Sequence, residues 1–353
     1  MSSSDVTRQG IRGERPGREA VPPRRERRGG RGERLMVDKA EFTSYYGRPV
    51  IKPPSWQPLD IAGYFFLGGL AGAGSVLAAG AHATGRPGMA RALKTSSALA
   101  LGGSVAALVH DLGRPARFAN MLRVFKPTSP MSVGSWILAG YGPLATGAAL
   151  LDRAGRLPRA GALCTAGAAL LGPAVATYTA VLAADTAVPA WHDAHRELPF
   201  VFAGSALAAA SGAALLAAPV AETGPARRTA LAGCAAEIAA SRLMRRRLGV
   251  VAETYRNGKA GRLTRAAEAL SVLGTAGALL APAAGRFGRR YERYGRFGRP
   301  AAVAAGAALL AASVCTRFGV FEAGVASARD PKYTVVPQRE RVERRGNPAR
   351  SGE

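Results

Sequence analysis

HDLGRPARFANMLRVFKPTSPMSVGSW, residues 110–136, is a polar, motif-rich stretch between two long apolar runs. It predicts the end of one helix, because Gly113 can adopt a left-handed cap and Pro115 cannot continue the helical turn. It also predicts the start of a second helix, because Pro130 suits a first turn. Three side chains are available as the N-cap of that second helix: Thr128, Ser129 and Ser132. The stretch is therefore a loop between two helices.

Eight apolar segments follow one another along the chain, and each approaches the ~20 residues that a bilayer span requires. Their expected bounds are 59–83, 92–111, 132–151, 160–184, 198–219, 227–244, 263–284 and 299–316. We therefore predict an all-α, polytopic membrane protein whose eight transmembrane helices form an antiparallel bundle. The first segment contains glycines at a spacing typical of closely packed helices in lipid, namely Gly68, Gly69, Gly72 and Gly74.

The charge of the chain is unevenly distributed. Its 353 residues carry a formal net charge of +25, yet 48% of them are hydrophobic, because Arg and Lys lie in the tails and between the apolar runs. This alternation is typical of a membrane protein with charged loops. A nucleic-acid-binding protein would place basic residues on helix faces with aromatic residues among them. We expect the lipid bilayer as a partner and no nucleic acid.

Three regions follow from composition. Residues 1–41 form an Arg/Gly-rich tail with few large apolar residues, which predicts disorder. Residues 42–320 form the transmembrane domain, which opens with an aromatic segment whose Tyr45, Tyr46 and Trp56 are expected in the interfacial belt. Residues 321–353 are expected to form a C-terminal cytoplasmic tail.

Basic residues near the span ends favour cytoplasmic termini. The 112–131 loop, the 242–265 region and both tails lie on one predicted side and are basic, whereas the Arg-rich 286–299 loop argues for the opposite orientation. We expect a multi-pass protein of the inner or plasma membrane with its termini in the cytoplasm.

Metal ligands are sparse in the sequence. Cys164, Cys234 and Cys315 each stand alone in apolar sequence, so the chain offers no iron-sulfur or zinc site of its own. Haem held by two histidines needs both at similar depth, and His82 and His110 are predicted near opposite ends of their helices. We expect no haem, no iron-sulfur cluster and no other metal in this chain.

Three sequence blocks resemble the NrfD/PsrC family, the integral membrane subunits of polysulfide reductase and related respiratory molybdoenzyme complexes. The blocks are DLGRP at 111–115 through Phe118 with PTSPMS at 127–132 and GSW at 134–136, TYTAVL at 177–182 with PAW at 189–191, and RFGVFEAG at 317–324 with DPKY at 330–333. The resemblance covers roughly residues 42–337 and leaves out only the tails.

The resemblance implies an eight-helix subunit, not catalytic by itself, that binds a menaquinone-type quinone noncovalently. It also implies a ferredoxin-like iron-sulfur partner and a molybdopterin catalytic subunit. The family's quinone pocket matches Asp60, Tyr64 and Tyr178 here, although Ile61 and Tyr64 stand where other branches carry Asn and His.

Each candidate for the quinone pocket also has a structural interpretation. Asp60 can contact a quinone or cap the first helix. Tyr64 lies one turn further on the same face, where it can donate to a quinone oxygen or belong to the aromatic belt. Tyr178 lies deeper, in an Ala/Leu/Val-rich helix, so its hydroxyl must find a partner.

Proton carriers are expected beside a quinone site, because quinone reduction takes up protons as well as electrons. Asp185, at the end of the fourth span, and Glu237, within the sixth, are predicted to be the most membrane-embedded carboxylates. Glu237 can instead pair with Arg242 or another basic side chain near the helix end. His110 and Asp111 lie where the second span meets the loop and can relay protons. A set of basic loop residues can dock an acidic partner surface, satisfy the loop or bind anionic lipid: Arg114, Arg117, Arg123 and Lys126.

Three functions remain open from the sequence. The chain can be a quinone-interacting membrane subunit that exchanges electrons with an iron-sulfur partner. It can be an ion-conducting or transporter-like subunit lined by Asp185 and Glu237, although no inverted repeat is evident. It can also be a passive membrane anchor without quinone chemistry.

Overall fold

The structure, a computed structural model, describes residues 6–7, 10–11, 49–112, 120–290 and 298–346. The chain divides into two compact units, Met1–Glu41 and Phe42–Glu353. In the first unit the described residues are two short antiparallel strands, β1 (Val6–Thr7) and β2 (Gly10–Ile11). The rest of the tail predicted to be disordered lies outside the described residues, as do Tyr45 and Tyr46.

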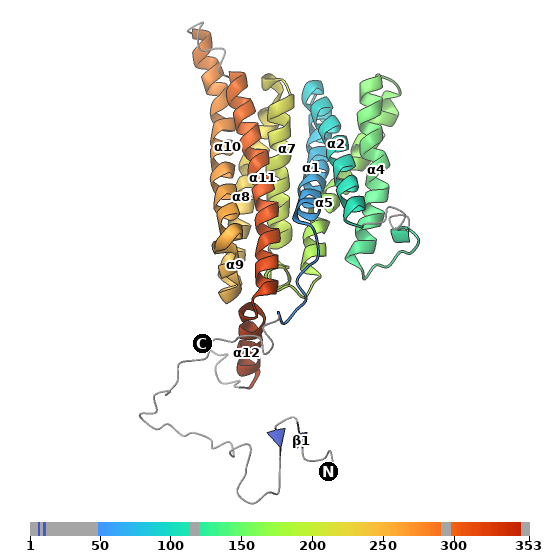
Figure 1. Cartoon of the computed structure of the whole chain (residues 1–353). Helices are drawn as coiled ribbons and strands as arrows, with labels where there is room; N and C mark the ends of the chain where they lie inside the picture. The colour runs from blue at the N-terminus through green and yellow to red at the C-terminus, as the bar shows by residue number, and fades with distance from the viewer. Residues whose placement is uncertain (1–5, 8–9, 12–48, 113–119, 291–297, 347–353) are drawn as a thin grey trace, which may run out of the picture. The chain divides into compact units, whose positions relative to one another are not determined.

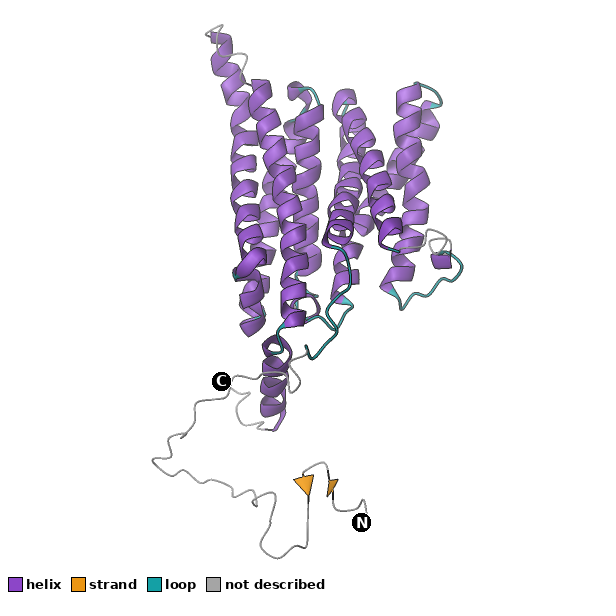
Figure 2. Cartoon of the chain, viewed as in Figure 1, coloured by secondary structure: helices purple, strands orange, loops and turns teal. Residues whose placement is uncertain are grey.

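Eight long helices make up most of the described part of the second unit, as the purple coils of Figure 2 show. Each overlaps one predicted apolar segment, in the same order, so the predicted all-α polytopic membrane fold is confirmed. Six of the eight have a proline in their first or second position, where its missing N–H costs no hydrogen bond. The helices are α1 (Pro58–Ala83), α2 (Pro87–Asp111), α4 (Pro130–Ala154), α5 (Pro158–Ala184), α7 (Leu198–Ala217), α8 (Gly224–Arg247), α10 (Gly258–Arg290) and α11 (Gly298–Arg329).

Five of these helices, α1, α2, α5, α7 and α11, are long and apolar enough by themselves to cross a membrane. The other three long helices, α4, α8 and α10, run alongside them (Figure 1). Short helices connect or follow the long ones: α6 (Pro189–His192), η2 (Val220–Glu222), η3 (Gly249–Ala252), α9 (Glu253–Arg256) and α12 (Lys332–Gly346).

The long helices form two four-helix units. The first contains α1, α2, α4 and α5, and the second contains α7, α8, α10 and α11. In the first unit, a Cβ built on Gly72 would lie 2.3 Å from the Gly172 carbonyl oxygen. In the second, a Cβ built on Gly212 would lie 2.6 Å from the Gly306 carbonyl oxygen. Glycine therefore lets α1 approach α5, and α7 approach α11, to backbone contact, as the small-residue spacing predicted.

One end of the bundle, called here the proximal end, holds the start of α1, the end of α2, the start of α4 and the end of α11 (Figure 1). Trp56, just before α1, stacks on Trp191 of α6 with ring centroids 5.6 Å apart. The buried Trp191 indole donates to the Val320 carbonyl oxygen at 2.8 Å. The half-buried Trp56 therefore attaches the segment before α1 to the bundle, and its predicted place in the aromatic belt stays a prediction.

The last long helix extends further than predicted. The predicted span ends at residue 316, before Arg317, but α11 continues to Arg329. It can do so because the Arg317 side chain is completely buried between helices instead of marking the edge of the membrane. The segment predicted as a C-terminal tail therefore begins inside α11 and contains α12.

Candidate functional site

The loop before α4 is held by two serines of the PTSPMS motif. Ser129 is the N-cap of α4, and its hydroxyl accepts from the Ser132 backbone N–H at 3.5 Å. The Ser132 hydroxyl accepts from the Lys126 N–H and donates to the Val124 carbonyl oxygen, both at 3.0 Å. The predicted cap and the helix start at Pro130 are thus confirmed. Residues 113–119 of the loop, among them Gly113, Arg114, Pro115 and Arg117, lie outside the described residues.

The described part of this loop presents basic and apolar side chains together. Arg123 and Lys126 are exposed, as are the intervening Val124 and Phe125. The Phe125 ring meets the edge of Trp136 with centroids 6.2 Å apart, and the Trp136 indole donates to the Val124 carbonyl oxygen at 3.4 Å. The surface is therefore ordered by contacts within the loop, which leaves both basic side chains free to contact another surface.

Asp60 and His110 form a hydrogen-bonded pair at the proximal end. The His110 Nδ1 lies 2.8 Å from the Asp60 Oδ2. The Asp60 side chain is 12% exposed, whereas the His110 side chain is 72% exposed. The N-cap of α1 is Gln57, so the interpretation of Asp60 as a helix cap is wrong. The pair instead connects a nearly buried carboxyl to the surface, with the half-buried Asp111 next in sequence.

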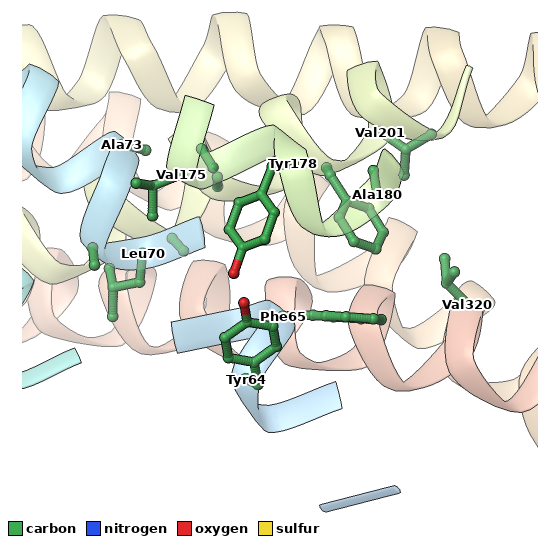
Figure 3. Packing of buried hydrophobic residues seen from close by; sticks show 14 of the residues in the cluster. Tyr64, Phe65, Leu70, Ala73, Val175, Tyr178, Ala180, Val201 and Val320 are labelled. Atoms are coloured by element: carbon green, nitrogen blue, oxygen red, sulfur yellow. The ribbon is translucent and has the colours of Figure 1, made fainter. Parts of the chain in front are cut away.

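Tyr64 and Tyr178 meet inside the first four-helix unit. Their ring centroids are 6.3 Å apart with an interplanar angle of 77°, and Figure 3 shows the two hydroxyl oxygens directed toward each other. Tyr64 is only 2% exposed, so its predicted alternative position in the aromatic belt is wrong. The Tyr178 ring rests against α4, where a Cβ on Gly134 would lie 2.3 Å from the Tyr178 Cε2 atom. Three helices thus position this pair.

The Tyr178 hydroxyl is buried and has no hydrogen-bond partner among the described residues. Other buried tyrosines are satisfied: the Tyr141 hydroxyl bonds to Ser75 at 2.7 Å and donates to the Ala71 carbonyl oxygen at 2.6 Å. Tyr255 donates to the Ala190 carbonyl oxygen at 2.9 Å. Because leaving a buried hydroxyl unsatisfied costs about 1–3 kcal/mol, the polar atom of a ligand that reached the Tyr178 hydroxyl would remove that cost.

Glu237 lies in the second four-helix unit and is 5% exposed, so its predicted burial is confirmed. Its carboxyl accepts from the Thr316 hydroxyl and, at 3.4 Å, from the Ser271 hydroxyl. The predicted alternative, a pair with Arg242, does not form, because the Arg242 side chain is exposed. Glu237 is therefore held by hydroxyl groups of α10 and α11.

Arg317 is a buried cation that the sequence analysis missed. Its side chain is 0% exposed, it donates to the Phe202 carbonyl oxygen at 2.8 Å, and its guanidinium lies 3.7 Å from the Phe202 ring centroid. The Nε and Nη1 atoms have no partner among the described residues. The signal in the sequence was the apolar run FGVFEAG directly after Arg317, which places the charge inside a helix.

Asp185 and the histidines lie toward the helix ends. Asp185 is the C-cap of α5, at the end of the fourth span as predicted, and its side chain is exposed instead of buried among the helices. His82 is in the last turn of α1, at the end of the bundle opposite His110. Within the described ranges, no three His, Cys, Asp or Glu side chains gather in a way that could hold a metal ion.

Comparison with known proteins agrees with this architecture. The sequence model of the family described as Polysulphide reductase, NrfD, matches residues 51–252, which is more than half of the chain and includes every residue of the Asp60, Tyr64 and Tyr178 site. The RFGVFEAG block lies beyond the matched region. No curated protein matches the chain. The chain belongs to the polysulphide reductase NrfD family, whose members are membrane subunits of respiratory oxidoreductase complexes.

Proposed function

We propose that this chain is the quinone-interacting membrane subunit of an oxidoreductase complex, passing electrons between a menaquinone-type quinone and a partner iron-sulfur subunit. The observation that carries the proposal is the Tyr178 hydroxyl, which is buried, has no partner among the described residues and is directed toward the Tyr64 hydroxyl.

The residues around this point suit a quinone. The carbonyl oxygens of a quinone accept hydrogen bonds, and Tyr64 and Tyr178 can each donate one. Phe65 and Val175, both almost completely buried, provide apolar surface nearby for the ring (Figure 3). Tyr64 and Tyr178 would therefore hold the headgroup, and the bound quinone would supply chemistry that couples two electrons to two protons.

Protons would move through Asp60 and His110. Asp60 lies one helical turn from Tyr64 on the same face of α1, and its carboxyl is hydrogen-bonded to the exposed His110. A proton released at the tyrosine pair would pass to the Asp60 carboxyl and then to the His110 imidazole, which exchanges with water. Asp111 and the exposed Asp185, at the same end of the bundle, would exchange protons with that water.

The iron-sulfur partner would dock at the proximal end. There the loop presents Arg123 and Lys126, together with exposed apolar side chains, to an acidic partner surface. Arg114 and Arg117 of the same loop would add to this contact. A molybdopterin catalytic subunit would bind on the far side of the iron-sulfur subunit. The loops predicted on the same side as the termini carry an excess of basic residues. This excess favours an orientation in which the proximal end lies on the cytoplasmic side of the inner membrane, as both termini would.

The test is to measure the quinone that remains bound to the purified complex. We expect menaquinone to be extracted from the wild-type complex and to be reduced in amount when Tyr64 and Tyr178 are both replaced by Phe. The Tyr141→Phe variant is the control, because that buried tyrosine has its hydrogen bonds within the protein.

Two results would contradict the proposal. The first is a wild-type complex that contains no quinone and whose turnover does not respond to added quinol, which would make this chain a passive anchor. Unchanged quinone content after the double substitution would place the quinone somewhere other than between α1 and α5.

A further inference from the structure

A cavity in the second four-helix unit connects the buried Glu237 carboxyl with the proximal end of the bundle. It lies among α8, α10 and α11, with Val201 of α7 and Tyr255 of α9 also in its wall. The centres of water molecules can occupy about 20 Å³ of it in total. Since one water needs roughly 10–15 Å³ of such volume, the cavity has room for about one or two waters and no room for a large ligand.

Polar side chains follow the cavity in two facing rows. On α8, Glu237, Ser241 and Arg245 are spaced by four residues, which places them on one face of the helix. On α10, Glu268 and Ser271 face them: Arg245 donates to Glu268 at 2.5 Å, and Ser271 donates to Glu237 at 3.4 Å. Ser241 lies between these two contacts. These polar side chains contribute to the polarity of α8 and α10, which are not among the five helices that are apolar enough by themselves to cross a membrane.

The two ends of the rows differ in exposure. At the mouth, the Glu268 side chain is 34% exposed and the Arg245 side chain 15%. At the inner end, Glu237 is 5% exposed, and no described cation lies within ion-pair distance of its carboxyl. A buried carboxylate without an ion pair is costly in a membrane interior, and protonation removes that cost.

We propose that this cavity holds water and carries protons between the Arg245–Glu268 pair at the surface and the Glu237 carboxyl. A proton arriving from water adds to a Glu237 carboxylate oxygen as O–H and leaves from the same oxygen to water. No electron transfer accompanies this step. The site is separate from the tyrosine pair, and the proposal does not depend on quinone binding.

The charged and titratable groups around Glu237 are few. Arg317 is its neighbour on α11, Glu268 and Arg245 are at the mouth, and Cys234 is one turn away on α8. α7 contributes the Ser205 hydroxyl and no titratable group. The Tyr255 hydroxyl in the cavity wall stays protonated, because burial raises its pKa above the ordinary value.

The test is infrared difference spectroscopy of the purified protein in lipid nanodiscs, without added quinone, as pH is varied. We expect a carboxyl C=O signal that titrates and is lost in the Glu237→Gln variant. A Ser241→Leu substitution fills the middle of the cavity, so the exchange of the Glu237 proton for deuterium should slow several-fold. Ser241→Ala leaves the cavity open and is the matched control, with exchange close to the wild-type rate.

Three results would overturn the proposal. The first is the absence of any titrating signal that Glu237→Gln removes while the protein stays folded. The second is an unchanged exchange rate in Ser241→Leu, which would mean that protons reach Glu237 by another route. The third is a signal that responds to Na⁺ concentration at fixed pH and not to pH, which would make the site a sodium site. Because no quinone is present, failure here leaves the proposed function standing, and the reverse also holds.

Discussion

Replacing Tyr178 with Phe separates a ligand-binding tyrosine from a structural one. The substitution removes only the hydroxyl, so the ring keeps its place against Gly134. Because that hydroxyl is buried and no described residue bonds to it, its removal relieves a cost of about 1–3 kcal/mol in the ligand-free protein. The same change removes one hydrogen bond to a bound quinone, worth about 0.5–1.5 kcal/mol, which weakens binding roughly 2- to 12-fold in Kd.

Tyr178→Phe is thus expected to stabilise the ligand-free protein and to weaken quinone binding. A control in the same four-helix unit should have the opposite effect on stability. Tyr141→Phe breaks hydrogen bonds to Ser75 and Ala71, so it should destabilise the fold by about 1–3 kcal/mol without changing quinone affinity. The assays are denaturant unfolding of quinone-depleted protein in nanodiscs and titration with a short-chain menaquinone. If Tyr178→Phe destabilises the ligand-free protein as much as Tyr141→Phe does, the Tyr178 hydroxyl is structural and the reasoning fails.

Three further predictions concern positions around the site and at the end of the chain. Gly134→Ala should displace the Tyr178 ring by about 1 Å and lower quinol-linked turnover by up to ~10²-fold, because the new Cβ would lie 2.3 Å from that ring. Gly142→Ala on the same helix meets only an ordinary contact at 3.9 Å and should retain activity. Equal turnover in the two variants would refute this prediction. Asp60→Asn should slow turnover by the complex in membranes most strongly where proton transfer limits the rate, so a pH profile identical to wild type would contradict the proposed relay. The Lys332 hydrogen bond lowers the pKa of the Glu253 carboxyl, and Glu253 in turn raises the pKa of the Lys332 ammonium. Their contact therefore stabilises the docking of α12 between about pH 4.5 and pH 10.5, the ordinary pKa values of Glu and Lys. This stabilisation is lost as pH falls below or rises above that range. Protection of α12 from hydrogen exchange that stays constant from pH 3 to neutral would count against it.

The order and number of the long helices could be predicted from apolar run length, because a membrane span needs a nearly continuous stretch of apolar residues. The start of α4 could also be predicted, since Ser129 and Pro130 act locally on the backbone. The end of α11 could not, because a lone Arg in an apolar run marks either the membrane edge or a buried contact. Which of the two applies to Arg317 depends on Phe202, a residue far away in the sequence.

The site shows the same division between local and long-range information. The i, i+4 spacing of Asp60 and Tyr64 correctly placed both on one face of α1. That Tyr64 faces Tyr178, and that Asp60 bonds to His110, follows from how α1 packs against α5 and α2. The predicted fourth span, 160–184, ended where α5 ends, at Ala184. That the side chain of the next residue, Asp185, is exposed instead of covered by neighbouring helices depends on packing that the apolar pattern does not contain.

Photoaffinity labelling with an azido-naphthoquinone tests the central claim most directly. Irradiation of the intact complex, followed by peptide mapping, identifies the helices that surround the bound headgroup. We predict that excess menaquinone blocks the labelling and that the labelled peptides come from α1 around Tyr64 and from α5 around Tyr178. Labelling confined to other helices, or labelling that menaquinone does not compete away, would contradict a quinone site between these two tyrosines.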